Sequence, residues 1–257
     1  MLFQKKLPKF EGKLIPEADF LGGDFGKAVL REYKGRIEND YTDDRPSDIL
    51  PSSALDILHY EDGIITGSNP FAVVLVNQIL KEEKLRTANQ SDLEKILKTK
   101  LLDLDKTYTD NALILRSSGA PNSYMAKILI NQVRKRNPKL KYPIMIPLYG
   151  LGLVKDTNSP RYGLSFTLKD NADIIYSPIL SKADKGFSED DIDEETGLPL
   201  KLSGRLSEDE GEGRILHNGR GGLCSLRFGK FLSLYAGTFM FDHYSHEGRI
   251  IVVKGKK

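Results

Sequence analysis

The sequence predicts an α+β protein in which helical and β-rich segments largely follow one another along the chain. Three observations lead to this class. Residues 70–98 carry two helical patterns with N-terminal capping signals, and residues 142–180 form short β-rich runs separated by turns. The final apolar run, 250–253, consists of β-branched residues, which favour strands. Such segregation of helices and strands is typical of α+β folds.

Bulk properties limit the function classes. The 257 residues suffice for one large domain or two small ones, and 39% hydrophobic with 29% charged residues is ordinary for a globular protein. A net charge of +2 indicates no polyanionic partner. We expect no membrane insertion and no signal peptide, because no run is apolar enough for either. The single Cys excludes an intrachain disulfide and a Cys-based structural zinc site.

Residues 1–50 predict an irregular N-terminal arm or a pair of short strands, because Gly and charged residues are spread throughout. Residues 43–51 are rich in turn formers and predict a linker. The sequence GGDFGK suggests a phosphate-binding loop, but Gly22 and Gly26 lie one residue too close and Ala28 replaces the required hydroxyl residue. A glycine turn is the favoured interpretation.

Two consecutive helices are predicted next, after a short strand at 63–66. The first runs from residue 70 to about 84, with Asn69 as cap and Pro70 in the first turn, and its apolar residues on nearly all faces predict burial. Thr87 and Gln90 match a capping box that opens the second helix. Its apolar stripe consists of Leu93, Ile96 and Leu97.

A strand at 111–116 and a third helix at 124–136 follow, the helix ending at Asn137-Pro138. The basic run 134–141 is typical of a solvated helix end, where cations suit the helix dipole. A nucleic-acid-binding module that uses this run and the basic C-terminus is an alternative function. It lacks the broad basic face or interleaved aromatic residues that such a module needs, so we expect no nucleic-acid partner.

The second half of the chain predicts strands within residues 142–180, an acidic excursion at 188–213 and a final buried strand. The acidic excursion invites comparison with a calcium loop. Counted from Asp191, however, Gly197 is seventh rather than sixth, and no helices flank it. A solvated loop is therefore favoured.

Residues 213–253 combine a regular framework with an unpatterned set of polar and aromatic residues. Three of the four histidines and the only cysteine fall here, which raises a second alternative, a small metal-dependent α/β enzyme. Its metal set would be His217, Cys224, His243 and His246, but their spacing matches no standard site. No Ser, Asp or Lys lies in a recognisable nucleophile motif. We therefore expect no catalytic residues, no metal and no cofactor.

Recognition chemistry is richer in this segment. Large rigid aromatic side chains mixed with adaptable hydrogen-bonding groups are typical of binding surfaces. We expect Phe228 in the core, with Arg227, Ser233 and Tyr235 on the opposite, outward face. The expected ligand-binding residues are His217, Asn218, Arg220, Cys224, Ser225, Arg227, Ser233, Tyr235, Thr238, Phe239, Phe241, Asp242, His243, Tyr244, Ser245 and His246.

The unpatterned residues share a coding property. Nearly all belong to the set encoded by codons that end in a pyrimidine, with Lys230 and Met240 as the exceptions between residues 215 and 246. Such a set arises when AAC-type asparagine codons are randomised at their adenines. The segment thus resembles the variable region of the variable proteins of diversity-generating retroelements, whose C-terminal coding segment is rewritten by mutagenic reverse transcription.

The framework resembles the same family. GGLCSLRF, FLSL and HEGRIIVV are similar to the G-L-x-x-L … G-R-[VI]-V-V-V ending of such proteins from archaeal viruses and small-genome microbes. Upstream, LRTANQSDLEKIL resembles the family's two-helix segment, where many members carry L-P-T-x-x-E-W. Here the chain departs from the pattern, because Leu93 replaces the aromatic residue and Trp is absent from the sequence.

The resemblance implies a C-type-lectin-like fold over residues 51–257, with two packed helices, a twisted antiparallel sheet and long irregular loops. It places an insertion at about 106–140 and the variable region at about 215–250; residues 1–50 and the insertion match nothing in the family. The implied function is binding of a protein or cell-surface ligand, on a virion or a cell surface. The lectin calcium motifs are absent, so calcium-dependent sugar binding is not implied.

Overall fold

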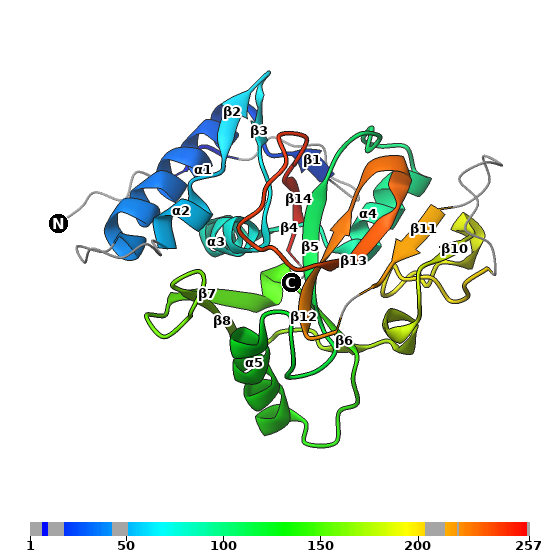
Figure 1. The fold of residues 1–257 in the computed structure, drawn as a ribbon. Coiled ribbons are helices and arrows are strands. Elements are labelled where there is room, and N and C mark those ends of the chain that lie inside the picture. Colours follow the sequence, from blue (N-terminus) through cyan, green and yellow to red (C-terminus); the bar gives the residue numbers. More distant parts are fainter. Residues whose placement is uncertain (1–6, 10–17, 43–50, 204–213, 220, 256–257) are drawn as a thin grey trace.

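The computed structural model describes residues 7–9, 18–42, 51–203, 214–219 and 221–255. The fold is α+β, as the sequence predicts, and is built around a curled seven-stranded sheet (Figure 1). All strand pairs in this sheet are antiparallel except β11 with β13, which makes the sheet mixed rather than purely antiparallel. Its spatial order is β10 (Lys185–Phe187), β11 (Arg214–His217), β13 (Leu234–Thr238), β12 (Leu223–Phe228), β5 (Thr109–Leu115), β6 (Ile144–Pro147) and β9 (Ile175–Tyr176).

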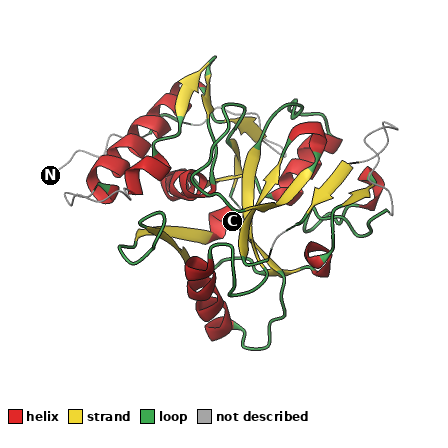
Figure 2. Ribbon diagram, in the orientation of Figure 1, coloured by secondary structure: helices red, strands yellow, loops and turns green. Residues whose placement is uncertain are grey.

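Three smaller sheets flank it. In one, β14 (Ile251–Lys254) pairs antiparallel with both β1 (Ala18–Phe20) and β4 (Leu85–Thr87), so strands from three distant parts of the chain meet. The other two are hairpins, formed by β2 (His59–Glu61) with β3 (Ile64–Thr66) and by β7 (Leu151–Lys155) with β8 (Leu164–Leu168). In Figure 2 the helices at the left lie side by side, and strands lie between them and the helices at the right and at the bottom.

Helix α3 (Pro70–Leu80) confirms the first predicted helix, although it ends earlier and continues as a short 3-10 turn, Lys81–Glu83. Asn69 caps it, since its side-chain oxygen accepts a 2.8 Å hydrogen bond from the Ala72 amide. Ten of its eleven residues are buried, in agreement with its apolar faces.

Helix α4 (Gln90–Lys98) confirms the second predicted helix but corrects its cap. The capping box is formed by Asn89 and Asp92. Thr87 is instead the last residue of β4, and it exchanges two hydrogen bonds with the side-chain amide of Asn77. The joint between the two helices therefore contains a strand, because Leu85–Thr87 pairs with β14.

The N-terminal segment departs most from its prediction. Residues 18–42 form strand β1, helix α1 (Gly23–Arg36) and a π-helical turn, Ile37–Tyr41, instead of an irregular arm. Helix α1 buries Phe25, Val29 and Tyr33 against the core, and Tyr33 donates a 2.5 Å hydrogen bond to the Leu55 carbonyl in α2 (Pro51–Leu55). The predicted linker, apart from Pro51, lies outside the described residues.

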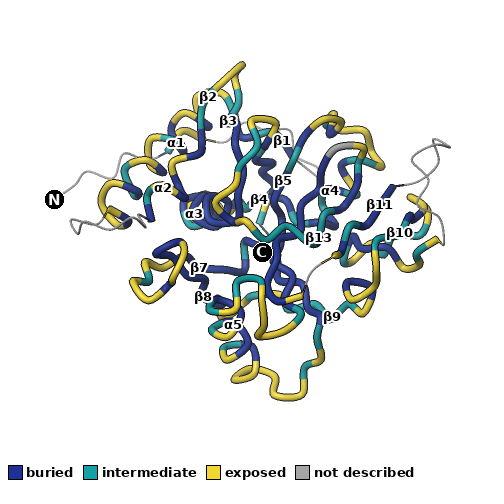
Figure 3. The backbone as a smooth tube through the Cα atoms, in the orientation of Figure 1, coloured by how far each residue is buried: buried dark blue, intermediate teal, exposed yellow. Residues whose placement is uncertain are grey.

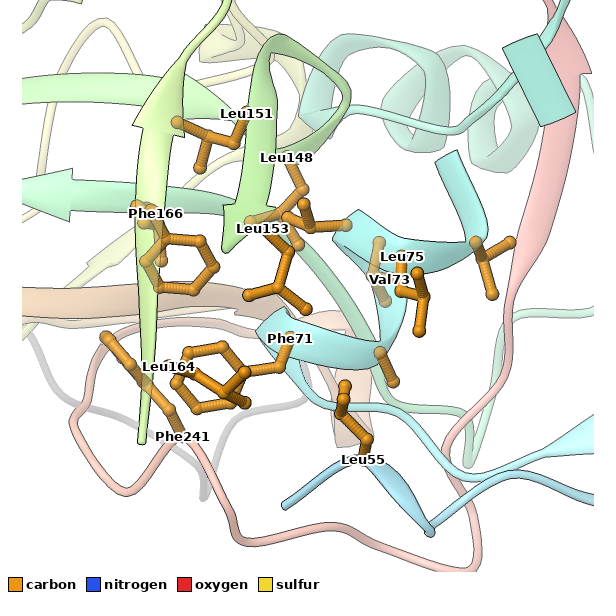
Figure 4. Close-up of a cluster of buried hydrophobic side chains, with 14 of the residues drawn as sticks. Leu55, Phe71, Val73, Leu75, Leu148, Leu151, Leu153, Leu164, Phe166 and Phe241 are labelled. Atoms are coloured by element: carbon orange, nitrogen blue, oxygen red, sulfur yellow. The ribbon is translucent and has the colours of Figure 1, made fainter. Parts of the chain in front are cut away.

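The apolar core lies in two clusters, and burial is greatest along the central strands (Figure 3). Helix α5 (Ser123–Arg136), which confirms the third predicted helix, joins α3 and the β7–β8 hairpin around the first cluster. Phe71 stacks on Phe166 there, and Phe241 packs edge-on against both (Figure 4). The second cluster holds Leu93 of α4.

The acidic excursion is irregular where it is described, apart from a 3-10 turn, Glu189–Asp191, and it is not fully solvated, because residues 197–199 are buried. Ile192 bridges to Pro199, and Asp193 accepts a 2.7 Å hydrogen bond from the Thr196 amide. Hydrogen bonds from Thr196 lower the pKa of the Asp193 carboxyl. Residues 204–213 lie outside the described part. No helix in the described ranges combines the length and apolar character needed to cross a membrane.

Candidate functional site

The segment from β11 to the end of the 239–250 loop supplies both sheet strands and surface, and the structure divides its predicted ligand-binding residues accordingly. Six of them are buried, which corrects their prediction as exposed contact residues: Asn218, Cys224, Ser225, Arg227, Ser233 and Phe241. Arg220 lies outside the described residues. The other nine are exposed or partly exposed.

Cys224, Ser225 and Arg227 are buried because β12 is an inner strand, paired with β13 on one side and β5 on the other. Arg227 therefore points to a partner inside the protein rather than to a ligand. Its Nε lies 3.4 Å from the Asp110 carboxylate, which also accepts a 2.8 Å hydrogen bond from Ser68. Alternation along β12 indicates two faces, but only the folded structure shows that both are covered, with Leu223 in the first core cluster and Leu226 and Phe228 in the second.

Asn218 holds three parts of the fold together. Its side chain donates a hydrogen bond to the Ile179 carbonyl at 3.2 Å and accepts one from Arg116 at 2.9 Å. Its backbone N–H donates a hydrogen bond to the Asp184 carboxylate at 2.6 Å. Burial lowers the pKa of the Arg116 guanidinium, and the neighbouring Cys224 opposes that shift. Ser233 is likewise structural, because its hydroxyl accepts a hydrogen bond from the Ile215 amide.

Five of the nine exposed or partly exposed residues line a hollow at the β11–β13 side of the central sheet. His217 and Tyr235 are direct neighbours across the parallel pair, and their rings stack with centroids 4.5 Å apart and planes 12° apart. The hollow has a volume of about 370 Å³. Besides these two residues it is lined by Asp184, Asn218, Gly219, Gly237, Thr238, Phe239, Met240 and His243.

A second hollow of about 320 Å³ shares Phe239 with the first. It lies between the start of α5 and the β7–β8 connection, with Tyr124 and Arg161 among its lining residues. The Phe239 backbone is fixed, since its carbonyl accepts a 2.9 Å hydrogen bond from Asn122. Phe239 therefore stands between two hollows on a supported backbone, which suits a contact residue.

The other residues of the 239–250 loop differ in their exposure and contacts. Asp242, His243 and His246 are exposed, and Asp242 pairs with Arg161 at 3.4 Å. Tyr244 packs edge-on against His246. In the turn that follows, the Ser245 backbone carbonyl accepts a hydrogen bond from the Gly248 amide. The irregular exposed loop expected here is confirmed, but Phe241 turns inward into the aromatic cluster of Figure 4.

Sequence reasoning missed several lining residues. Asp184 precedes the segment by 30 residues and reaches the hollow because β10 pairs with β11, with Lys185 opposite Leu216. No local signal marks it. Met240 lines the hollow and is 38% exposed, although methionine lies outside the set of residues encoded by codons that end in a pyrimidine.

The side chains that line the first hollow can make stacking, apolar and hydrogen-bonding contacts. Across the described ranges, no three His, Cys, Asp or Glu residues gather as a metal site would require, and Cys224 is buried apart from the surface histidines. The hollow offers aromatic rings, a thioether, imidazoles and one carboxylate. No protein-family model, curated protein or solved structure matches the chain.

Proposed function

We propose that the protein is a ligand-binding protein that displays a diversified surface on a C-type-lectin-like scaffold, as a variable protein of a diversity-generating retroelement. One observation carries the proposal: within a single segment, some side chains are buried in the sheet and core, while five of the nine exposed or partly exposed ones line the first hollow, beside Phe239. Exposed substitutions usually change stability by no more than about 0.5 kcal/mol. The surface can therefore change while the fold persists.

The scaffold assignment is supported by the arrangement of α3 and α4. The two helices are joined through β4, which is hydrogen-bonded to β14 directly after the proposed variable region. The long irregular loop 239–250 connects β13 of the curled sheet to β14 of the three-stranded sheet (Figure 1). The segment is thus held by paired strands at both its start and its end.

The proposed ligand is a protein or cell-surface molecule, and the proposed location is a virion or a cell surface. Aromatic and hydrogen-bonding side chains on a supported backbone favour a macromolecular surface, because rigid aromatic groups provide contact area at low entropic cost. Tyr235 and Phe239 are the aromatic residues of this kind nearest the first hollow.

Sequencing many copies of the gene from one population tests the proposal. We expect substitutions to concentrate at partly exposed positions such as His217, Tyr235, Thr238, Phe239 and His243. The buried Asn218 and Phe241 should remain constant, and so should residues 51–203. Substitutions distributed evenly along the gene, or concentrated at buried positions, would contradict the proposal.

A further inference from the structure

Among the described residues that line the hollow beside β11 and β13 there is one carboxylate, and it comes from outside the proposed variable region. Asp184 lies just before β10. Its Oδ1 accepts hydrogen bonds from the Asn218 amide at 2.6 Å and the Gly219 amide at 3.3 Å. Two backbone donors on one oxygen fix the orientation of the carboxylate. The site is therefore organised before any ligand arrives.

The second carboxylate oxygen is placed differently. Asp184 Oδ2 lies 3.6 Å from His217 Nδ1, too far for a hydrogen bond, and the two side chains are 40% and 32% exposed. The oxygen thus keeps acceptor capacity at a partly open position. A ligand with N–H donors and a positive charge would gain a charge-assisted hydrogen bond there.

The walls of the hollow are flat and apolar. The stacked rings of His217 and Tyr235 form one wall, and Phe239 and Met240 contribute further apolar surface. A guanidinium is planar, stacks on aromatic faces and is more weakly hydrated than an ammonium, so it suits a carboxylate beside flat rings. A volume of about 370 Å³ lies at the low end for small-ligand sites and suits a single side chain.

The neighbouring fixed cation does not fill this role. Arg116 donates to the Leu180 carbonyl at 2.7 Å and to Asn218 Oδ1 at 2.9 Å, so its guanidinium supports Asn218. Among the described residues that line the hollow, the other titratable side chains are the imidazoles of His217 and His243 and the phenol of Tyr235.

We propose that this hollow binds the guanidinium of an arginine side chain presented by a protein ligand, with Asp184 as its anion. The inference rests on the proposed function and adds to it: the scaffold supplies a constant anchor, and the residues around it adjust the fit. The protein partner of the chain with this sequence would carry an exposed arginine at the centre of the surface that it presents.

The test is an NMR titration of the ¹⁵N-labelled full chain with N-acetyl-L-arginine amide. We expect saturable shifts of the Gly219 and Gly237 amides with a dissociation constant on the order of 1 mM, equivalent to about −4 kcal/mol. N-acetyl-L-lysine amide should bind several-fold more weakly. The tyrosine and glutamate analogues should cause no saturable shift at these glycines.

Two variants provide the contrast. Asp184→Asn keeps an oxygen for the two amides but removes the charge, and should weaken arginine amide binding about tenfold or more. Asp170→Asn changes an exposed carboxylate that pairs with Arg136 and does not line the hollow, and should leave binding unchanged. The inference is overturned if arginine amide gives no saturable shift, if the tyrosine or glutamate analogue binds equally well, or if Asp184→Asn binds like the unaltered protein.

These outcomes are independent of the population test. A failed titration together with substitutions concentrated around the hollows would overturn the arginine anchor alone. Evenly spread substitutions would overturn the diversified surface, whether or not arginine amide binds.

Discussion

Arg214 and Glu94 form a two-pronged ion pair between the first residue of β11 and helix α4. Their N–O distances are 2.5 and 2.7 Å, and the side chains are only 4% and 10% exposed. Arg214 also lies between the rings of Phe187 and Phe228, and Gln90 donates to the Glu94 carboxylate at 2.6 Å. The residue that directly precedes the proposed variable region is therefore bound to a helix residue 120 positions earlier in the chain.

Breaking this pair should destabilise the fold strongly. Glu94→Gln leaves the Arg214 charge buried without its counterion, and such changes cost about 3–5 kcal/mol. The free energy of unfolding from urea titrations measures the loss. Glu194→Gln is the matched control, because its pair with Lys98 is 85% and 81% exposed, and it should change stability by less than about 0.5 kcal/mol. Equal effects of the two changes would contradict the structural role of the pair.

The Cys224 thiol should be unreactive in the folded protein. Its side chain is fully buried in β12, so reaction with a thiol reagent requires opening of the sheet. We expect labelling to be at least about 10³-fold slower in buffer than in concentrated guanidinium chloride, given typical unfolded fractions. Met240→Cys in a Cys224→Ala background is the control and should label rapidly while folded, since residue 240 is 38% exposed. Rapid native labelling of Cys224 would place it on the surface after all.

Neighbouring residues 240 and 241 should differ sharply in their contribution to stability. Phe241→Ala removes a fully buried ring that contacts Phe71, Phe166 and Tyr162, and should cost about 3–5 kcal/mol. Met240→Ala should cost less than about 1 kcal/mol, because its side chain is partly exposed. Urea midpoints of the two variants decide the matter. A mild effect of Phe241→Ala would mean that residue 241 belongs to the surface.

Stability should rise between about pH 8 and pH 10. Burial lowers the pKa of Lys169 to about 8 in the folded protein, from 10.5. The folded state then binds fewer protons than the unfolded state across this window, so the free energy of unfolding increases with pH. Above pH 10 the sign reverses, because burial raises the pKa of Tyr41 and of Tyr149 to about 12, and unfolded tyrosines ionise first.

Lys169→Met should remove the rise between pH 8 and pH 10. Lys169 donates a 2.9 Å hydrogen bond to the Tyr149 carbonyl, whereas Lys139 is exposed and serves as the control position. Urea midpoints at pH 7, 8, 9 and 10 provide the comparison. A rise that persists in Lys169→Met, or disappears in Lys139→Met, would assign the effect to another group.

Local signals predicted the helices well. Asn69 and Pro70 mark the start of α3 because capping is a contact between residues three apart, which sequence spacing records. The N-terminal helix α1 was missed because its start is glycine-rich, with Gly23 in a left-handed conformation, although its buried residues Phe25, Val29 and Tyr33 follow helical spacing. Packing against the core, rather than intrinsic propensity, stabilises such a helix.

The site was predicted less well, for a different reason. Whether Ser225 or Tyr235 is exposed depends on which elements cover the faces of β12 and β13, and that depends on strand pairing and packing between residues far apart in sequence. Asp184 enters the hollow through the same long-range pairing. The aromatic loop after β13 needed no such knowledge, because its lack of alternation already indicated irregular structure.

Strand β14 follows the proposed variable region and supplies the middle strand of the sheet that joins β1 to β4. A frameshift or stop codon introduced anywhere in residues 214–250 would thus replace or delete Ile251–Lys254. The product would lose the strand that unites its N-terminal and helical parts, and would fail to fold. A full-length, in-frame chain through Lys254 is therefore a condition for folding, whatever residues the exposed positions carry.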